Sequence, residues 1–178
     1  MKRFVLLMIG YIIFVPVALA KVTAVDERGF ISEHVLVVKA APDAALRALM
    51  QDVHRWWDAS HSFGGSASSF RIDDRAGGCF CEEVEGGVSV EHMRVVNVQP
   101  GRSLTLIGGL GPMQAMALSG SMTFQFKDHP EGSELHYRYS VGGYLPEGMP
   151  GLADAVDRVQ LAQLERLAAY ISTGKSLN

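Results

Sequence analysis

Two cysteines, Cys79 and Cys81, lie one residue apart behind a pair of glycines, and the 178-residue chain has no others. This spacing could serve a disulfide, half of a metal site or a reactive thiol pair. In a regular strand the Cβ atoms of such residues lie about 6.6 to 6.8 Å apart, whereas a disulfide needs about 3.5 to 4.5 Å. We therefore expect no bridge in a regular strand. Only a bulge, which Gly77 and Gly78 could start, would allow one.

A zinc site is the second chemistry that the two thiols could serve. Two thiolates would need two further ligands to complete a tetrahedral site. The sequence has no second cysteine pair and no HxxxH spacing. We therefore expect no metal, and no motif points to another cofactor.

The turn that follows the cysteines decides which residues face inward. A two-residue turn at Gly86–Gly87 would place Glu82 directly opposite Glu91. We favour a three-residue loop at Glu85–Gly87, because it avoids that like-charge pair and gives one apolar face. This loop pairs Val84 with Val88, Glu82 with Val90 and Phe80 with His92. The apolar face then gathers Phe80, Val84, Val88, Val90 and Val96, and the other face carries Cys79, Cys81, Glu83 and Glu91.

On this register Glu82 and His92 are the polar residues that face the interior. A carboxylate beside an imidazole in a dry pocket holds one tautomer and raises the histidine pKa. That pair suits general acid–base catalysis or the binding of a polar ligand head. A structural hydrogen bond without chemistry is the alternative interpretation.

Six further residues are candidates to line a pocket: Trp56, His61, Phe80, Tyr137, Tyr139 and Gln163. Trp57 continues the apolar stripe of its helix, so the adjacent Trp56 cannot face the core and could cover a pocket entrance instead. His61 follows in a loop rich in glycine and serine. Gln163 falls within an apolar arc, where an unpaired buried amide would cost about 1 to 3 kcal/mol. Core packing remains the alternative for both tyrosines.

The periodicity of apolar residues indicates the elements that position these side chains. A strand is predicted at 30–40, an amphipathic helix at 42–58 and a long helix at 152–173. Between them, short alternating runs separated by Gly, Pro and Asn/Asp turns predict an antiparallel meander. The pattern predicts an α+β fold in which a curved antiparallel sheet of about six or seven strands wraps round the C-terminal helix.

Several short motifs resemble a known superfamily. The first strand running into APDAALRAL, the tryptophan pair of HRWWDASH, the glycine-rich hairpins and the last amphipathic helix resemble START-like (SRPBCC, helix-grip) proteins. The bacterial polyketide cyclase/dehydrase-like or Hsp90-ATPase-activator-like branch is most similar, over Ile31 to Ser172. The resemblance implies a hollow between sheet and helix that holds a hydrophobic small molecule. Such a fold hosts carriers, enzymes and regulators, so it does not settle function.

The N-terminal 20 residues have the layout of a secretory signal peptide. Lys2 and Arg3 precede an apolar run, and small residues end it in an A-x-A site at Ala20. A retained anchor is the alternative, although the run falls short of the roughly 20 apolar residues that span a bilayer. We expect one START-like domain at 21–178, periplasmic or secreted and without stable membrane insertion after cleavage. Export argues against an Hsp90 role.

The charge of the chain argues against a nucleic-acid partner, because the net charge is −3 and the sequence has no basic run.

The sequence is compatible with three functions. The favoured one is a binding protein for a hydrophobic or amphipathic small molecule. A cofactor-independent cyclase, dehydratase or hydrolase would use His92 or Glu82 as acid or base. A protein-interaction module would present the cysteine strand on an exposed surface, to a protein partner that the sequence does not identify.

Overall fold

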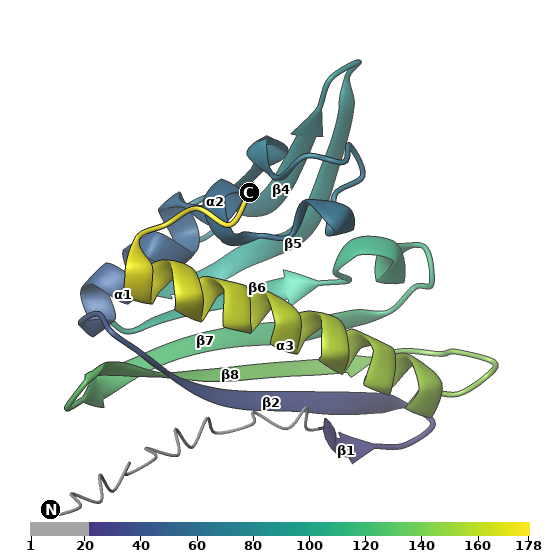
Figure 1. Cartoon of the computed structure of the whole chain (residues 1–178). Coiled ribbons are helices and arrows are strands. Elements are labelled where there is room, and N and C mark those ends of the chain that lie inside the picture. The colour runs from purple at the N-terminus through teal and green to yellow at the C-terminus, as the bar shows by residue number, and fades with distance from the viewer. Residues whose placement is uncertain (1–21) are drawn as a thin grey trace, which may run out of the picture.

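A computed structural model describes residues 22–178 as an α+β fold, and the expected signal peptide at 1–20 lies outside the described residues. One antiparallel sheet has eight strands in the order β1-β2-β8-β7-β6-β5-β4-β3 (Figure 1). The strands are β1 (Val22–Val25), β2 (Gly29–Val38), β3 (Phe70–Ile72), β4 (Cys79–Val84), β5 (Val88–Gln99), β6 (Ser103–Gly108), β7 (Ser119–His129) and β8 (Gly132–Gly142). The short edge strand β1 takes the sheet beyond the expected six or seven strands.

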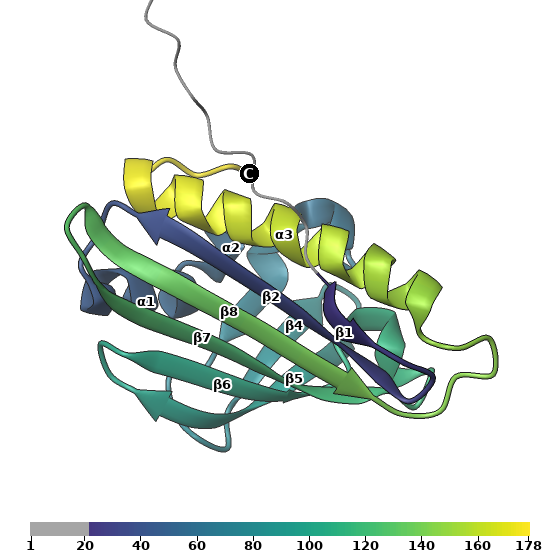
Figure 2. The ribbon, with the colours of Figure 1, turned by 90° about the horizontal axis from the view of Figure 1, so that it is seen from below.

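The helices are α1 (Pro42–Gln51), α2 (Val53–Trp56) and α3 (Pro150–Thr173), with 3-10 turns η1 (Ala59–His61), η2 (Ala67–Ser69) and η3 (Gly111–Gln114). The long helix α3 lies along the sheet and packs against β2, as the two views show (Figures 1 and 2). It ends at Gly174, whose φ of 69° is the left-handed conformation that glycine adopts at helix ends. Within residues 22–178, no helix is both long and apolar enough to cross a bilayer.

The core lies between the sheet and the helices. Alternate residues of β8 point into it, with Leu135, Tyr137 and Tyr139 almost completely buried. The alternation of β2 places Phe30 and Val38 on the same inner face. This face also buries two polar side chains, Ser32 and His34.

The helix expected at 42–58 is shorter than predicted and is divided. Asp52 interrupts it with φ −111° and ψ 21°, and α2 then ends at Trp56. Trp57 has extended backbone angles, so the two tryptophans do not point apart as they would on a continuous helix. Both are buried, with 2% and 6% of their surface exposed. The expectation that only one of them could face the core was wrong.

The hairpin of β4 and β5 has the predicted three-residue loop. Val84 lies opposite Val88 and Glu82 opposite Val90. The register then shifts by one residue, because Cys81 lies opposite Glu91 while Phe80 lies opposite Met93, not His92 as expected. His92 is therefore the extra residue of a β-bulge in β5. Beyond the bulge the alternation changes phase, so Val95 is buried and Val96, predicted inside, is 39% exposed.

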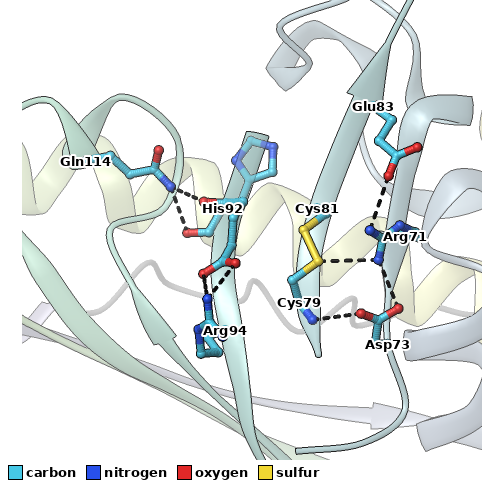
Figure 3. Close-up of a disulfide and its surroundings, with 9 residues drawn as sticks. Arg71, Asp73, Cys79, Cys81, Glu83, His92, Arg94 and Gln114 are labelled. Carbon is cyan, nitrogen blue, oxygen red and sulfur yellow. Dashed lines mark hydrogen bonds and ion pairs between the residues drawn. A yellow bond between two sulfur atoms is a disulfide. The ribbon is translucent and has the colours of Figure 1, made fainter. Parts of the chain in front are cut away.

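Cys79 and Cys81 form a disulfide beside this bulge, with Cα atoms 5.4 Å apart (Figure 3). The expectation of no bridge was wrong, because these Cα atoms are closer than the roughly 6.6 to 6.8 Å of a regular strand. Two residue steps on β4, from Cys79 to Cys81, match three steps on β5, from Arg94 to Glu91. The irregularity lies in the partner strand and does not start at the glycine pair that precedes the cysteines.

Candidate functional site

A pocket of about 450 Å³ opens between α3, strand β5 and the η3 turn. Its walls come from four segments: the stretch after α2, strand β5, the η3 turn and the first half of α3. The lining residues are Trp57, Ser60, His61, Ser62, Phe63, His92, Leu110, Gly111, Pro112, Met113, Leu152, Ala155, Val156, Val159 and Gln160. Most of these side chains are apolar, and His92 is the lining residue that comes from the sheet.

His92 is paired with Glu82 across the hairpin. Their side chains keep 3% and 0% of their surface exposed, and His92 Nε2 lies 3.2 Å from Glu82 Oε2. An ionised carboxylate accepts hydrogen bonds only, so Nε2 carries the proton and donates it. His92 faces the inside as expected, and the bulge turns the next residue, Met93, inward as well.

Glu82 also holds the loop that forms the pocket rim. Its carboxylate accepts hydrogen bonds from the hydroxyls of Ser62 and Ser69 and from the backbone N–H groups of Phe63 and Gly64. The two backbone bonds measure 3.2 and 3.0 Å. A single buried carboxylate therefore connects β4 to the segment that carries the rim of the pocket.

The electrostatics of the pair follow from its burial and its hydrogen bonds. Burial raises the pKa of Glu82, but the hydrogen bonds from Ser62, Gly64, Phe63 and His92 outweigh it and hold that pKa below 4.5. Burial lowers the pKa of His92 below 6.5, and the opposing effect of Glu82 is the smaller one. The expected rise of the histidine pKa was wrong, because desolvation dominates at this position. His92 is neutral at pH 7.

Two buried polar atoms of the pocket lining have no hydrogen-bond partner within the described residues. They are Nδ1 of His92 and Nε1 of Trp57. With the proton on Nε2, His92 Nδ1 is a free acceptor, whereas the indole N–H is a donor. Buried polar groups are nearly always paired in folded proteins, so each unpaired one needs an explanation.

Aromatic rings hold both groups in place. Trp57 packs against Phe70 and Phe80 at centroid distances of 5.6 and 5.1 Å. His92 packs against the same two phenylalanines, at 5.3 and 5.2 Å. Phe63 lies 5.9 Å from the His92 ring and is 60% exposed, so it covers the imidazole from the rim.

The predicted site residues do not all lie in the pocket wall. His61 and His92 line it, whereas Glu82 and Phe80 lie directly behind His92. Trp56 is buried and donates its indole N–H to Leu49 O, so the wall is formed by the neighbouring Trp57.

Three further predicted residues are buried beside the pocket. Tyr137 and Tyr139 belong to the core, and Tyr137 donates its hydroxyl to Gln160 Oε1 at 2.8 Å. Gln163 accepts a hydrogen bond from the backbone of Asp58, and its Nε2 has no partner among the described residues. Gln160, one helical turn earlier, is the glutamine that lines the pocket.

A second buried polar cluster, which was not predicted, lies between β2 and α3. Asp157 accepts hydrogen bonds from Ser32 and His34, at 2.5 and 2.9 Å. The His34 ring stacks against Tyr137 at 6.1 Å. A signal existed, because Ser32 and His34 share one face of β2 with the buried Phe30 and Val38. Asp157 also lies three residues before Gln160, on the same face of the helix.

Metal chemistry finds no support in the described part of the chain. Residues 22–178 contain no group of three or more His, Cys, Asp or Glu side chains arranged to hold an ion. Both cysteines are consumed in the disulfide.

Comparison with known proteins identifies the fold. No protein-family model matches the chain, and no curated protein does. A solved structure from Rhizobium leguminosarum shares 18% identity over 80% of this chain and 95% of its own, with a TM-score of 0.59. DynU16, a protein in the dynemicin biosynthetic locus, shares 19% over 85% of this chain and 49% of its own, with a TM-score of 0.58.

CalU16 from Micromonospora echinospora shares 15% identity over 82% of this chain and 77% of its own, with a TM-score of 0.51. Identities this low show a common fold and nothing finer. The curved antiparallel sheet and the long C-terminal helix of this chain therefore form a helix-grip fold.

Proposed function

We propose that this protein binds a hydrophobic or amphipathic small molecule in the pocket between α3 and the sheet. The observation that carries the proposal is the unpaired Nδ1 of His92, buried in a wall that is otherwise mostly apolar. A volume of about 450 Å³ lies within the roughly 300 to 1,000 Å³ of small-molecule sites. Such sites combine apolar walls with a few placed polar groups, as here.

The polar end of the ligand is a hydroxyl group on this proposal. A hydroxyl donates one hydrogen bond and accepts others, so it can satisfy both the acceptor of His92 and the donor of Trp57. Both side chains pack on the same pair of phenylalanines. The apolar part of the ligand then lies against α3 and the η3 turn.

A second candidate is a cofactor-independent enzyme, for which the neutral, carboxylate-paired His92 would be the base. The imidazole has its free lone pair on Nδ1 and its proton held by Glu82. This arrangement suits the removal of a proton from a bound hydroxyl or an acidic carbon. The likeness to DynU16, a protein from a biosynthetic locus, is compatible with this candidate but carries no reaction.

We place the binding function in the periplasm or outside the cell, on the strength of the N-terminal signal pattern. The partner is then a small molecule carried outside the cytoplasm. The mature mass, measured on protein purified from its own host, tests this placement, because cleavage after Ala20 leaves Lys21 as the first residue.

Paired probes test the ligand chemistry directly. We expect 1-naphthol to bind about tenfold more tightly than 1-methylnaphthalene, because the hydroxyl adds about 1 to 1.5 kcal/mol through one buried hydrogen bond. His92→Phe should abolish this preference while leaving the affinity for 1-methylnaphthalene nearly unchanged. His54→Gln, at an exposed histidine outside the pocket, is the matched control. Equal affinities of the two probes for the unmodified protein would contradict the proposal.

The same variants separate the two candidates once a natural ligand is known. Native mass spectrometry on protein from its own host would show that ligand as an adduct released on denaturation. A binding protein should return it unchanged after incubation. An enzyme should convert it, and His92→Phe should then slow the conversion by orders of magnitude.

A further inference from the structure

The disulfide belongs to a separate group of side chains on the opposite face of the hairpin from Glu82 and His92. Phe80, between the two cysteines, points into the core, so Cys79 and Cys81 point to the other side of the sheet. They keep 9% and 6% of their surface exposed. Arg71 on β3 reaches across to Cys79, as Figure 3 shows.

The cation contacts one sulfur in particular. Arg71 Nη1 lies 3.3 Å from Cys79 Sγ, and no hydrogen bond joins it to Cys81. Asp73 and Glu83 hold the guanidinium in this position, at 2.9 and 3.2 Å. Asp73 also accepts the backbone N–H of Cys79, at 2.9 Å, so the cysteine and its cation share one support. A positive charge at this distance stabilises a thiolate more than a thiol.

The ring closed by this disulfide is very short, with one residue between the two cysteines. A disulfide stabilises a fold mainly by restricting the unfolded chain, and this contribution grows with the length of the closed loop. A three-residue loop gains little in this way. The bond therefore contributes little to the free energy of unfolding. Its position beside a cation indicates a role other than stabilisation.

We propose that Cys79–Cys81 is a thiol–disulfide exchange site, at which a dithiol attacks Cys81 and Cys79 leaves as a thiolate stabilised by Arg71. In the first step the dithiol forms a mixed disulfide with Cys81 Sγ, and the bond between the two cysteines breaks. The second thiol of the dithiol then displaces Cys81. The dithiol ends as a disulfide and its two electrons reside on the two cysteines; one of its protons ends on Cys81, and the other is released to solvent while Cys79 stays a thiolate.

The substrate class is a small dithiol or the exposed dithiol of another protein, since the sulfurs are near the surface but not open. Arg71 acts on the leaving sulfur alone, because its guanidinium contacts Cys79 and not Cys81. This exchange goes beyond the proposed ligand binding and does not depend on it. A protein that fails to bind 1-naphthol could still exchange, and the reverse also holds.

The rate of reduction of the folded protein tests the proposal. The protein is exposed to dithiothreitol without denaturant and quenched with iodoacetamide, and mass spectrometry counts the alkylated thiols over time. We expect both cysteines to be reduced in the native state. Arg71→Gln should slow the reduction by about three- to tenfold, because a leaving thiol with a higher pKa departs more slowly. Arg158→Gln, which removes an exposed cation of α3, should match the unmodified protein.

Glu83→Gln tests the same step from the other direction and keeps the test valid if Arg71→Gln fails to fold. Glu83 is 66% exposed and takes part of the Arg71 charge, so its loss should speed the reduction by about twofold. Reduction that occurs only after unfolding would overturn the proposal. So would equal rates for Arg71→Gln, Glu83→Gln and the unmodified protein.

Discussion

Two buried histidine–carboxylate pairs occur in this fold, and they differ in what surrounds them. His92–Glu82 joins two neighbouring strands, and His34–Asp157 joins the sheet to α3. The side chains of both pairs are at most 4% exposed. His92 borders the pocket and keeps an unpaired Nδ1, whereas His34 is absent from the pocket wall and stacks on Tyr137.

The comparison shows that pairing alone does not mark a functional residue. The His34 cluster uses its carboxylate to hold a strand and a helix together, with all three of its members pointing at one another. Glu82 uses its carboxylate to hold a rim loop, and its histidine keeps a free acceptor. We therefore base the proposed ligand site on the pair whose histidine has an unpaired atom and lines the pocket.

The largest effect is expected from Asp157→Ala. It leaves Ser32 and His34 buried without their acceptor, and breaking a buried pair in this way costs about 3 to 5 kcal/mol. Urea unfolding measures this loss of stability. Asp154→Ala, at an exposed position of the same helix, is the control and should change it little. A loss below about 1 kcal/mol would mean that the cluster does not hold α3 to β2.

Glu82→Gln should lower the stability less than Asp157→Ala does, and it should weaken ligand binding more. It replaces a carboxylate that accepts five hydrogen bonds by an amide that accepts fewer, at about 1 to 3 kcal/mol. Because the rim loop loses its anchor, the affinity for 1-naphthol should fall by about tenfold or more. Calorimetric titration gives the affinity, and Glu83→Gln on the exposed face is the control. An unchanged affinity would mean that the rim loop does not contribute to binding.

Acid should destabilise the pocket pair in two stages. The folded protein keeps His92 neutral, whereas the unfolded chain binds a proton there below pH 6.5, so stability falls as the pH drops below 6.5. The Glu82 pKa is lowered in the folded protein, so its contribution is lost as the pH falls below 4.5. Urea unfolding at a series of pH values measures both. His92→Phe should remove the loss of stability below pH 6.5 and keep the loss below pH 4.5. If the loss below pH 6.5 is unchanged in this variant, a titratable group other than His92 causes it.

The smallest effect is expected from Phe63→Ala. Its ring is 60% exposed, so the free energy of unfolding should change by at most about 0.5 kcal/mol. Since the ring covers His92, the affinity for 1-naphthol should weaken by about threefold through access of water to the imidazole. Tyr144→Ala, at a residue that is 80% exposed, should alter neither quantity. Equal effects of the two variants would mean that Phe63 does not contribute to ligand binding.

Strand alternation and turn chemistry were enough to predict the α+β fold and the Glu82–His92 contact. The bulge was not predictable, because a single extra residue in β5 leaves no local mark in the sequence. That one residue explains the exposure of Val96 and why Phe80 lies opposite Met93 and not His92. The His34–Asp157 pair was missed for another reason: its members are 123 residues apart, and alternation gives a face but not a partner. Trp56 was misplaced because the helix breaks at Asp52 and ends at Trp56, which a continuous helical period does not predict.

The way in which Glu82 holds the rim loop has a consequence for redesigning ligand preference. Two of its donors, at Phe63 and Gly64, are main-chain amides, which every residue except proline supplies. Position 63 can therefore be randomised without cutting the anchor, and His61 beside it can vary as well. Position 64 cannot, because a Cβ there would lie 2.6 Å from Val84 Cγ1. A combinatorial library at 61 and 63 with glycine kept at 64 would explore new rims on an unchanged scaffold.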